Sequence, residues 1–131
     1  GGCLHVLSQI LAVRPGIDNK EICMFISNFL KKKEDVEILG IANTDEDEIK
    51  MIDNLKPEIV ITDLMRNHKN TGLDIIKNYF GKDNSPKFLV ISAGDKNEIY
   101  CENIDVAGFI KKPFFDYEII YSELKRIKEN I

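Results

Sequence analysis

Residues 59–62, Ile-Val-Ile-Thr, are an apolar run of strand length that leads into the carboxylate of Asp63. Because β-branched residues follow one another without polar alternation, the run is typical of a strand buried on both faces of a parallel sheet. In open α/β sheets, ligands bind beyond the carboxyl ends of the strands. Asp63 is therefore a candidate for chemistry, although for this stretch alone an aspartate that only starts a turn is the stronger interpretation.

Strand and helix patterns alternate five times along the chain. Apolar runs predict strands, and apolar residues spaced by three and four predict the helices between them. The predicted strands are residues 10–13, with a start as early as residue 7 left open, 36–42, 58–63, 88–91 and 106–110. The predicted helices start near residues 19, 45, 71, 95 and 117, and the helix over 95–103 should be the least stable. Right-handed crossovers then give an α/β fold, a doubly wound three-layer sandwich around a parallel sheet.

Composition limits the class of protein. The 131 residues suit one domain, residues 1–131. A net charge of -4 gives no electrostatic footprint for nucleic acid. The three cysteines lack Cys-x-x-Cys spacing, which favours a reducing cytoplasm over a disulfide or zinc framework. The apolar opening is too short to cross a membrane. Because the chain opens on Gly-Gly, we expect a trimmed piece of a longer protein, with a C-terminal output domain as one option.

Three polar residues each end or follow a different predicted strand: Asp63, Ser92 and Lys112. Parallel strands share one carboxyl edge, so these side chains should converge there. A carboxylate can act as a nucleophile toward phosphorus, an ammonium pairs with phosphoryl oxygens, and a divalent cation on a second carboxylate neutralises charge. Each residue alone has a plainer interpretation as a turn former or surface group. Their joint placement predicts a site that accepts a phosphoryl group.

The motifs PEIVITD, VISA and AGFIKKPF resemble those of receiver domains of bacterial two-component response regulators, over almost the whole chain. The resemblance implies a flavodoxin-like (CheY-like) sandwich with strand order 2-1-3-4-5. It implies that Asp63 is the phosphoacceptor, Ser92 the phosphate-sensing hydroxyl, Phe109 the switch aromatic and Lys112 the phosphate-binding lysine. A sensor histidine kinase or phosphotransfer protein would be the partner, and chemistry would be limited to phosphotransfer and dephosphorylation at Asp63. The fourth helix, fifth strand and fifth helix would form the signalling face.

The chain departs from the family at the end of strand one, where the family carries an acidic pair that holds Mg²⁺. A gapless alignment back from Asp63 puts Ile17 and Asp18 at the pair. An alignment that ends the strand at residue 13 puts Arg14-Pro15 there, and burial favours it because those two residues suit a doubly buried strand poorly. Asp18, Asp63 and the Met65 carbonyl then form the expected Mg²⁺ ligand set, weaker than the usual one.

Three functions remain to be weighed. The first is a receiver phosphorylated on Asp63. The second is a phosphorylation-independent receiver in which Arg14 pairs with Asp63 and the domain serves dimerisation or docking. The third, an enzyme or flavin carrier, is disfavoured. An aspartyl phosphatase, for example, needs an acidic residue at the position of Met65. The loop after Asp63 is longer than usual and lacks proline, and its His68 is expected to be solvent-exposed.

Overall fold

Five parallel strands form one sheet between two layers of helices in the computed structural model, which describes residues 4–9, 19–42, 44–62, 71–83, 85–92, 106–111 and 116–130. The strands are β1 (Leu4–Gln9), β2 (Val36–Ile41), β3 (Ile59–Thr62), β4 (Lys87–Ser92) and β5 (Gly108–Lys111). The helices are α1 (Asn19–Lys31), α2 (Asp45–Leu55), α3 (Thr71–Tyr79) and α5 (Glu118–Glu129). The strand order β2-β1-β3-β4-β5 confirms the predicted α/β, doubly wound, flavodoxin-like arrangement.

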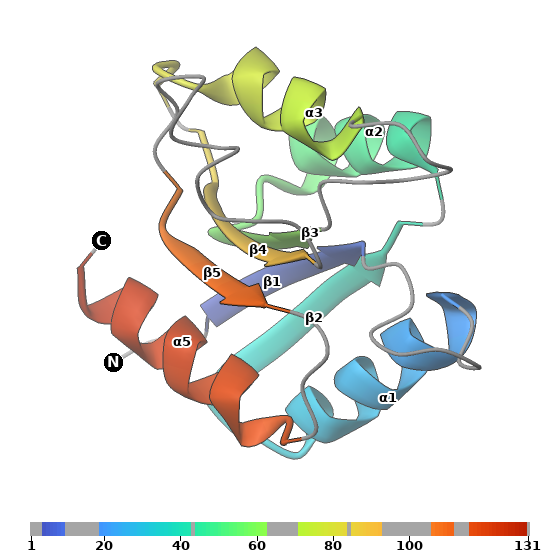
Figure 1. Cartoon of the computed structure of the whole chain (residues 1–131), viewed down its shortest axis with the longest axis vertical. Coiled ribbons are helices and arrows are strands. Elements are labelled where there is room, and N and C mark those ends of the chain that lie inside the picture. The colour runs from blue at the N-terminus through green and yellow to red at the C-terminus, as the bar shows by residue number, and fades with distance from the viewer. Residues whose placement is uncertain are drawn as a thin grey trace.

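The helices cover the two faces of the sheet in pairs. In Figure 1, α2 and α3 lie on one side of the strands and α1 and α5 on the other. Alternation along the strands divides the core in the same way. Ile59 and Ile61 of β3 pack with the cluster under α1 and α5, whereas Val60 packs with the cluster under α2 and α3. All three side chains are fully buried, as a central strand requires.

Local signals fix the ends of α2 and α3. The Thr44 hydroxyl accepts a hydrogen bond from the Asp47 backbone N–H at 3.0 Å, so Thr44 is the N-cap of α2, within the predicted turn. Lys56, just before Pro57, ends the same helix in the left-handed region with φ 49°. Gly81 has φ 77° just after α3, where glycine adopts the left-handed region without a steric penalty.

Three large apolar side chains that follow the helical spacing of their neighbours are exposed and not covered: Phe25 by 46%, Leu55 by 44% and Phe80 by 51%. Each lies at the margin of the buried surface of its helix. Phe25 borders the buried stripe of α1 that contains Ile26, Leu55 is in the last turn of α2, and Phe80 follows the last residue of α3. A helical stripe is a narrow band, so spacing alone does not fix which marginal residues are covered.

The first strand lies earlier than the sequence predicted. Residues 10–13 are outside the described residues, and the strand between β2 and β3 is Leu4–Gln9. Its last residue, Gln9, pairs with Thr62 at the end of β3. The strand ends expected from the two alignments, at residue 13 and before Ile17-Asp18, lie outside the described residues. The predicted helix over 95–103 also lies outside the described residues.

Helix α5 packs closely on β5. A Cβ atom added at Gly108 would lie 2.9 Å from Leu89 Cδ1 and 3.1 Å from Arg126 Nη2. The same Arg126 nitrogen donates to the Ala107 carbonyl oxygen at 2.6 Å, and Lys128 Nζ lies 3.0 Å from Glu58 Oε1. Glycine at position 108 is what lets the helix approach. None of the helices in the described part of the chain combines the length and apolar character needed to cross a membrane.

The Tyr79 side chain joins α3 to α2. Its ring is buried in the α2–α3 cluster, and its hydroxyl donates to Asp53 Oδ1 at 2.8 Å. Burial, then the hydrogen bond to Asp53, raises the pKa of Tyr79 above its ordinary value of 10.0. The folded protein therefore keeps the phenol proton at pH values where the unfolded chain loses it.

We expect Tyr79→Phe to cost about 1 kcal/mol of unfolding free energy near neutral pH, because one hydrogen bond is lost. Above about pH 10 the unfolded wild-type chain binds fewer protons than the folded one, so wild-type stability falls as pH rises. The Tyr79→Phe variant lacks this loss, so the difference in unfolding free energy between the two proteins should shrink as pH rises. Urea unfolding at pH 8 and at pH 10.5 measures this, and a gap that widens at the higher pH would contradict the assignment.

Candidate functional site

The carboxyl ends of β3, β4 and β5 lie at one edge of the sheet. Thr62 ends β3, and Ser92 ends β4 and pairs with Lys111, the last residue of β5. Asp63 and Lys112 lie outside the described residues, but each directly follows one of these strand ends in the chain. Consecutive Cα atoms are about 3.8 Å apart, so the predicted acid and lysine are both anchored at this edge.

Strand spacing sets the separation of the two anchors. β4 lies between β3 and β5, and neighbouring strands are about 4.8 Å apart, so the anchors of Asp63 and Lys112 are on the order of 10 Å apart. The lysine carries its charge on a flexible four-carbon stem, which can reach across the end of one strand.

Two buried hydroxyl residues lie at this edge, and one of them, Ser92, lies between the anchors. Ser92 is 1% exposed and Thr62 is fully buried, and both are the last residues of their strands. By alternation, Ser92 shares the α2–α3 face with Phe88 and Val90, which belong to that cluster. A hydroxyl has one proton to donate and two lone pairs to accept with. A hydroxyl that is held in the sheet, not on a loop, presents that donor from a fixed position.

Phe109 of β5 is half-buried on the same face. It pairs with Val90 and packs against the α2–α3 cluster. Ser92 lies two residues beyond Val90 on the neighbouring strand, which puts the Cα atoms of Ser92 and Phe109 on the order of 8 Å apart. Ser92 and Phe109 are therefore on neighbouring strands and on one face of the sheet.

The end of β1 was missed by the sequence analysis. Ser8 and Gln9 are the last two residues of this strand, and neither is acidic. The family that the motifs resemble carries an acidic pair at the end of strand one. The predicted Mg²⁺ ligands Asp18, Asp63 and Met65 all lie outside the described residues, as do Arg14 and His68. Leu4–Gln9 is less apolar than the run at residues 10–13, which is why the apolar pattern placed the strand later.

Comparison with known proteins supports a shared architecture. No protein-family model matches the chain. The chain is 30% identical over 109 residues to a protein-glutamate methylesterase/protein-glutamine glutaminase of Bacillus subtilis (strain 168), and the match covers 81% of this chain but 29% of that relative. The chain therefore spans less than a third of the length of the curated relative that it matches.

Solved structures similar to this chain are of receiver type. A DNA-binding response regulator of the LuxR family from Staphylococcus aureus has a TM-score of 0.74 at 17% identity, covering 95% of this chain and 98% of that one. The response regulator domain of Thermotoga maritima CheB has a TM-score of 0.71 at 18% identity, covering 98% of each chain. The Francisella response regulator 1452 receiver domain has a TM-score of 0.73 at 17% identity, covering 97% of this chain and 98% of that one. This chain therefore has the fold of response regulator receiver domains.

Proposed function

We propose that the chain accepts a phosphoryl group on Asp63 from a sensor histidine kinase or a phosphotransfer protein. The observation that carries the proposal is the meeting of three strand ends at one edge, with the buried Ser92 between the anchors of Asp63 and Lys112. No single motif has this property, because the three residues are far apart in the chain. The edge is also where open α/β sheets bind ligands.

The transfer needs few groups. An oxygen of the Asp63 carboxylate attacks the phosphorus of a phosphohistidine on the donor, a P–O bond forms, and the P–N bond breaks with its electrons returning to the imidazole. The product is an acyl phosphate on Asp63. The Lys112 ammonium pairs with its oxygens, and the Ser92 hydroxyl donates to one of them. In this proposal the chain has no enzymatic activity beyond phosphotransfer and dephosphorylation at Asp63.

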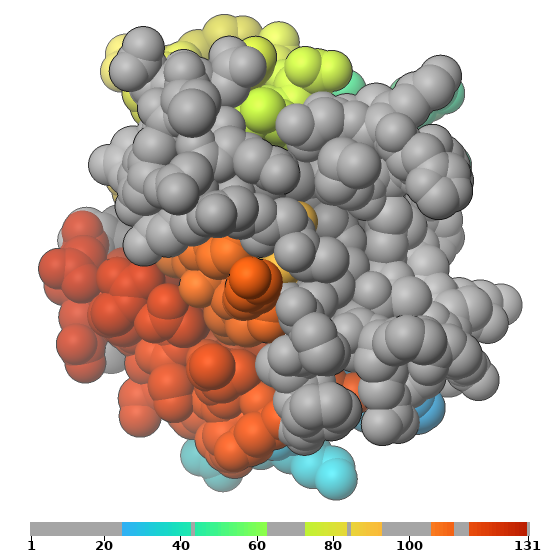
Figure 2. All heavy atoms as spheres, in the orientation of Figure 1, coloured from blue at the N-terminus to red at the C-terminus, as the bar shows by residue number. Residues whose placement is uncertain are grey.

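The signal would leave through β5 and α5. In the space-filling view, the residues of β5 and α5 form one continuous orange-to-red surface (Figure 2). Ser92 moving toward a phosphoryl oxygen would draw Phe109 with it, and β5 connects that ring to α5 through Ala107 and Arg126. Phosphorylation then shifts a population between two packings of this surface. A change of partner or a homodimer at this surface is the proposed output.

A phosphorylation-independent receiver is the second candidate, and the end of β1 favours it. Ser8 and Gln9 supply no carboxylate where the strand ends, so a Mg²⁺ site would depend on Asp18, Asp63 and the Met65 carbonyl. The described residues at this edge do not by themselves fit a magnesium site, and the transfer above is written without a metal. In this candidate, Arg14 pairs with Asp63 and the domain serves docking.

A titration with beryllofluoride distinguishes the two candidates. Followed by amide NMR, it should shift the backbone signals of Ser92 and Phe109, because beryllofluoride bound to a carboxylate mimics the phosphoryl group. Repeating the titration with and without Mg²⁺ shows whether the site uses a metal. If neither series moves those two signals, the domain does not take up a phosphoryl group and the docking candidate stands.

A further inference from the structure

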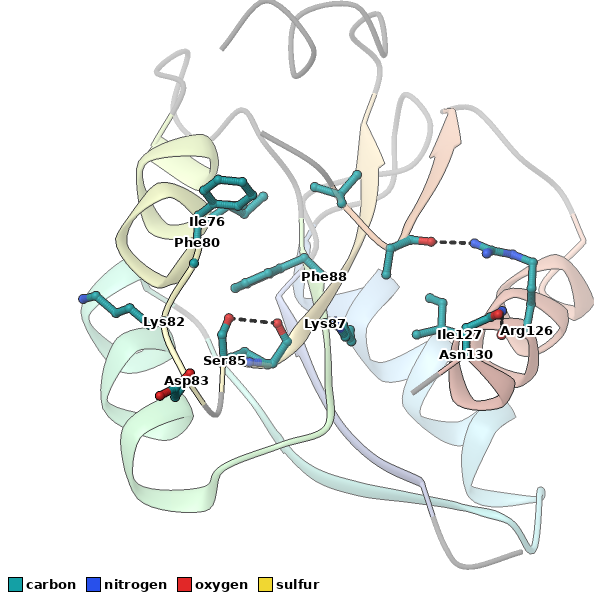
Figure 3. A pocket seen from close by; sticks show the side chains of 14 residues that line it. Ile76, Phe80, Lys82, Asp83, Ser85, Lys87, Phe88, Arg126, Ile127 and Asn130 are labelled. Atoms are coloured by element: carbon teal, nitrogen blue, oxygen red, sulfur yellow. Dashed lines mark hydrogen bonds between the residues drawn. The ribbon is translucent and has the colours of Figure 1, made fainter. Parts of the chain in front are cut away.

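A cavity of about 700 Å³ lies at the edge of the sheet opposite to the carboxyl ends of β3, β4 and β5. One wall is the end of α3 and the connection to β4, and the other is the last part of α5 (Figure 3). Its floor includes Val106 and Ala107, just before β5. Pockets that bind small molecules commonly have volumes of roughly 300 to 1,000 Å³. The cavity therefore has the size of a ligand site, and it shares no residue with the proposed phosphorylation site.

The cavity is lined in part by apolar groups. Phe80 is 51% exposed although it is a large aromatic residue, and it lines one wall beside Ile76. Figure 3 shows the Phe88 side chain directed toward the wall of Phe80, with Ile127 on the opposite wall. An exposed aromatic side chain beside a hollow is a surface that gains stability when an apolar group covers it.

Two cationic side chains flank this apolar surface. Lys87 is exposed at the start of β4, and its ammonium has no partner among the described residues. The Arg126 guanidinium uses Nε and Nη2 for Glu123 and the Ala107 carbonyl, which leaves Nη1 without a partner among those residues. Lys82 is a third cation in the lining, although Figure 3 shows it directed away from the centre.

Opposite charge is scarcer at the cavity. Asp83 is the one acidic residue in its lining, against three cations, and Glu123 outside the lining pairs with Arg126, which leaves an excess of one positive charge. The chain as a whole carries a net charge of -4, so a local excess of positive charge at this cavity runs against the average of the surface. Fixed positive charge beside an apolar wall attracts an anion with an apolar body and disfavours a cation of the same shape.

We propose that this cavity is a binding site for a small organic anion with an aromatic or aliphatic body, such as an aryl carboxylate. The apolar body would lie against Phe80, and the carboxylate would face Lys87 and the unpaired Arg126 Nη1. The proposal is independent of phosphorylation at Asp63. An acidic peptide or a second copy of this chain would be a different occupant, and the experiment below separates these from a small anion.

Three probes with one apolar body test the proposal: 4-phenylbutyrate, 4-phenylbutan-1-ol and 4-phenylbutylamine. Amide NMR titrations should show 4-phenylbutyrate shifting the signals of Phe80, Phe88 and Val106, with an affinity about tenfold above that of the alcohol. The amine should bind more weakly than the alcohol. Equal affinity of the three probes, or no shift at these residues, would overturn the proposal. The same shifts produced by raising the protein concentration without a probe would show that a second copy occupies the face, and would also overturn it.

Paired variants identify the groups involved. Lys87→Gln should remove most of the preference for the carboxylate over the alcohol, whereas Lys50→Gln, an exposed lysine on α2, should leave it unchanged. Phe80→Ala should weaken the binding of both the carboxylate and the alcohol. Phe25→Ala, which changes a similarly exposed phenylalanine on α1, should leave both affinities unchanged. All four positions are exposed, so the variants should fold, and amide spectra verify this. Equal effects of Lys87→Gln and Lys50→Gln would show that general surface charge, not this cavity, attracts the anion.

Discussion

Replacing Asp63 by asparagine should abolish labelling of the protein by radioactive acetyl phosphate. The amide cannot act as the nucleophile that forms an acyl phosphate, and no other carboxylate is proposed as the acceptor. Label on the parent protein should be released by hydroxylamine, as expected for an acyl phosphate and not for a phosphorylated hydroxyl. The measured quantity is the radioactivity incorporated per mole of protein.

Asp83→Asn is the matched control for this variant. Asp83 is an exposed aspartate at the opposite edge of the sheet, so its replacement should leave labelling at the parent level. Asp63→Asn that is labelled as strongly as the parent would place the acceptor elsewhere. If neither the parent nor the control is labelled, the result contradicts phosphorylation at Asp63 and favours the phosphorylation-independent receiver.

Leu124→Ala should lower the free energy of unfolding by about 3 kcal/mol. Leu124 is fully buried in the cluster that α5 forms with the sheet, and truncation there loses both transfer energy and packing. Ile119→Ala on the same helix is the control, because Ile119 is 45% exposed and should change stability by less than about 1 kcal/mol. Urea unfolding followed by circular dichroism measures both. Equal losses at the two positions would mean that α5 does not pack on the sheet through Leu124.

Some elements could be predicted from the sequence because a buried strand or helix face has a characteristic pattern of apolar residues. The fully buried β3 reads as a continuous apolar run, and α5 repeats its buried residues Ile120, Leu124 and Ile127 at steps of four and three. Strand one could not be located in this way. The run at residues 10–13 is more apolar than Leu4–Gln9, yet Leu4–Gln9 forms ladders with two neighbours. Hydrogen bonding between strands is a property of the assembled sheet and leaves no local signature.

The two edges of the sheet differ in how far the sequence reveals them. The expectation that Asp63, Ser92 and Lys112 share an edge needed only the positions of three strand ends. The opposite cavity joins Phe80, Lys87 and Arg126, which belong to no motif and are brought together by the packing of α3 and α5. The exposure of Phe80 was the feature that spacing misjudged, and it is the feature on which the cavity depends.

The position of β5 makes it easier to displace than the central strand β3. It is a four-residue strand at the margin of the sheet, hydrogen-bonded to β4 alone, whereas β3 has a ladder on each side. Its two faces reach different halves of the interior, Phe109 on one and Ile110 on the other. A small displacement of the chain just after Lys111 would therefore loosen the single ladder of backbone hydrogen bonds to β4, and it would disturb the packing on both faces of the sheet.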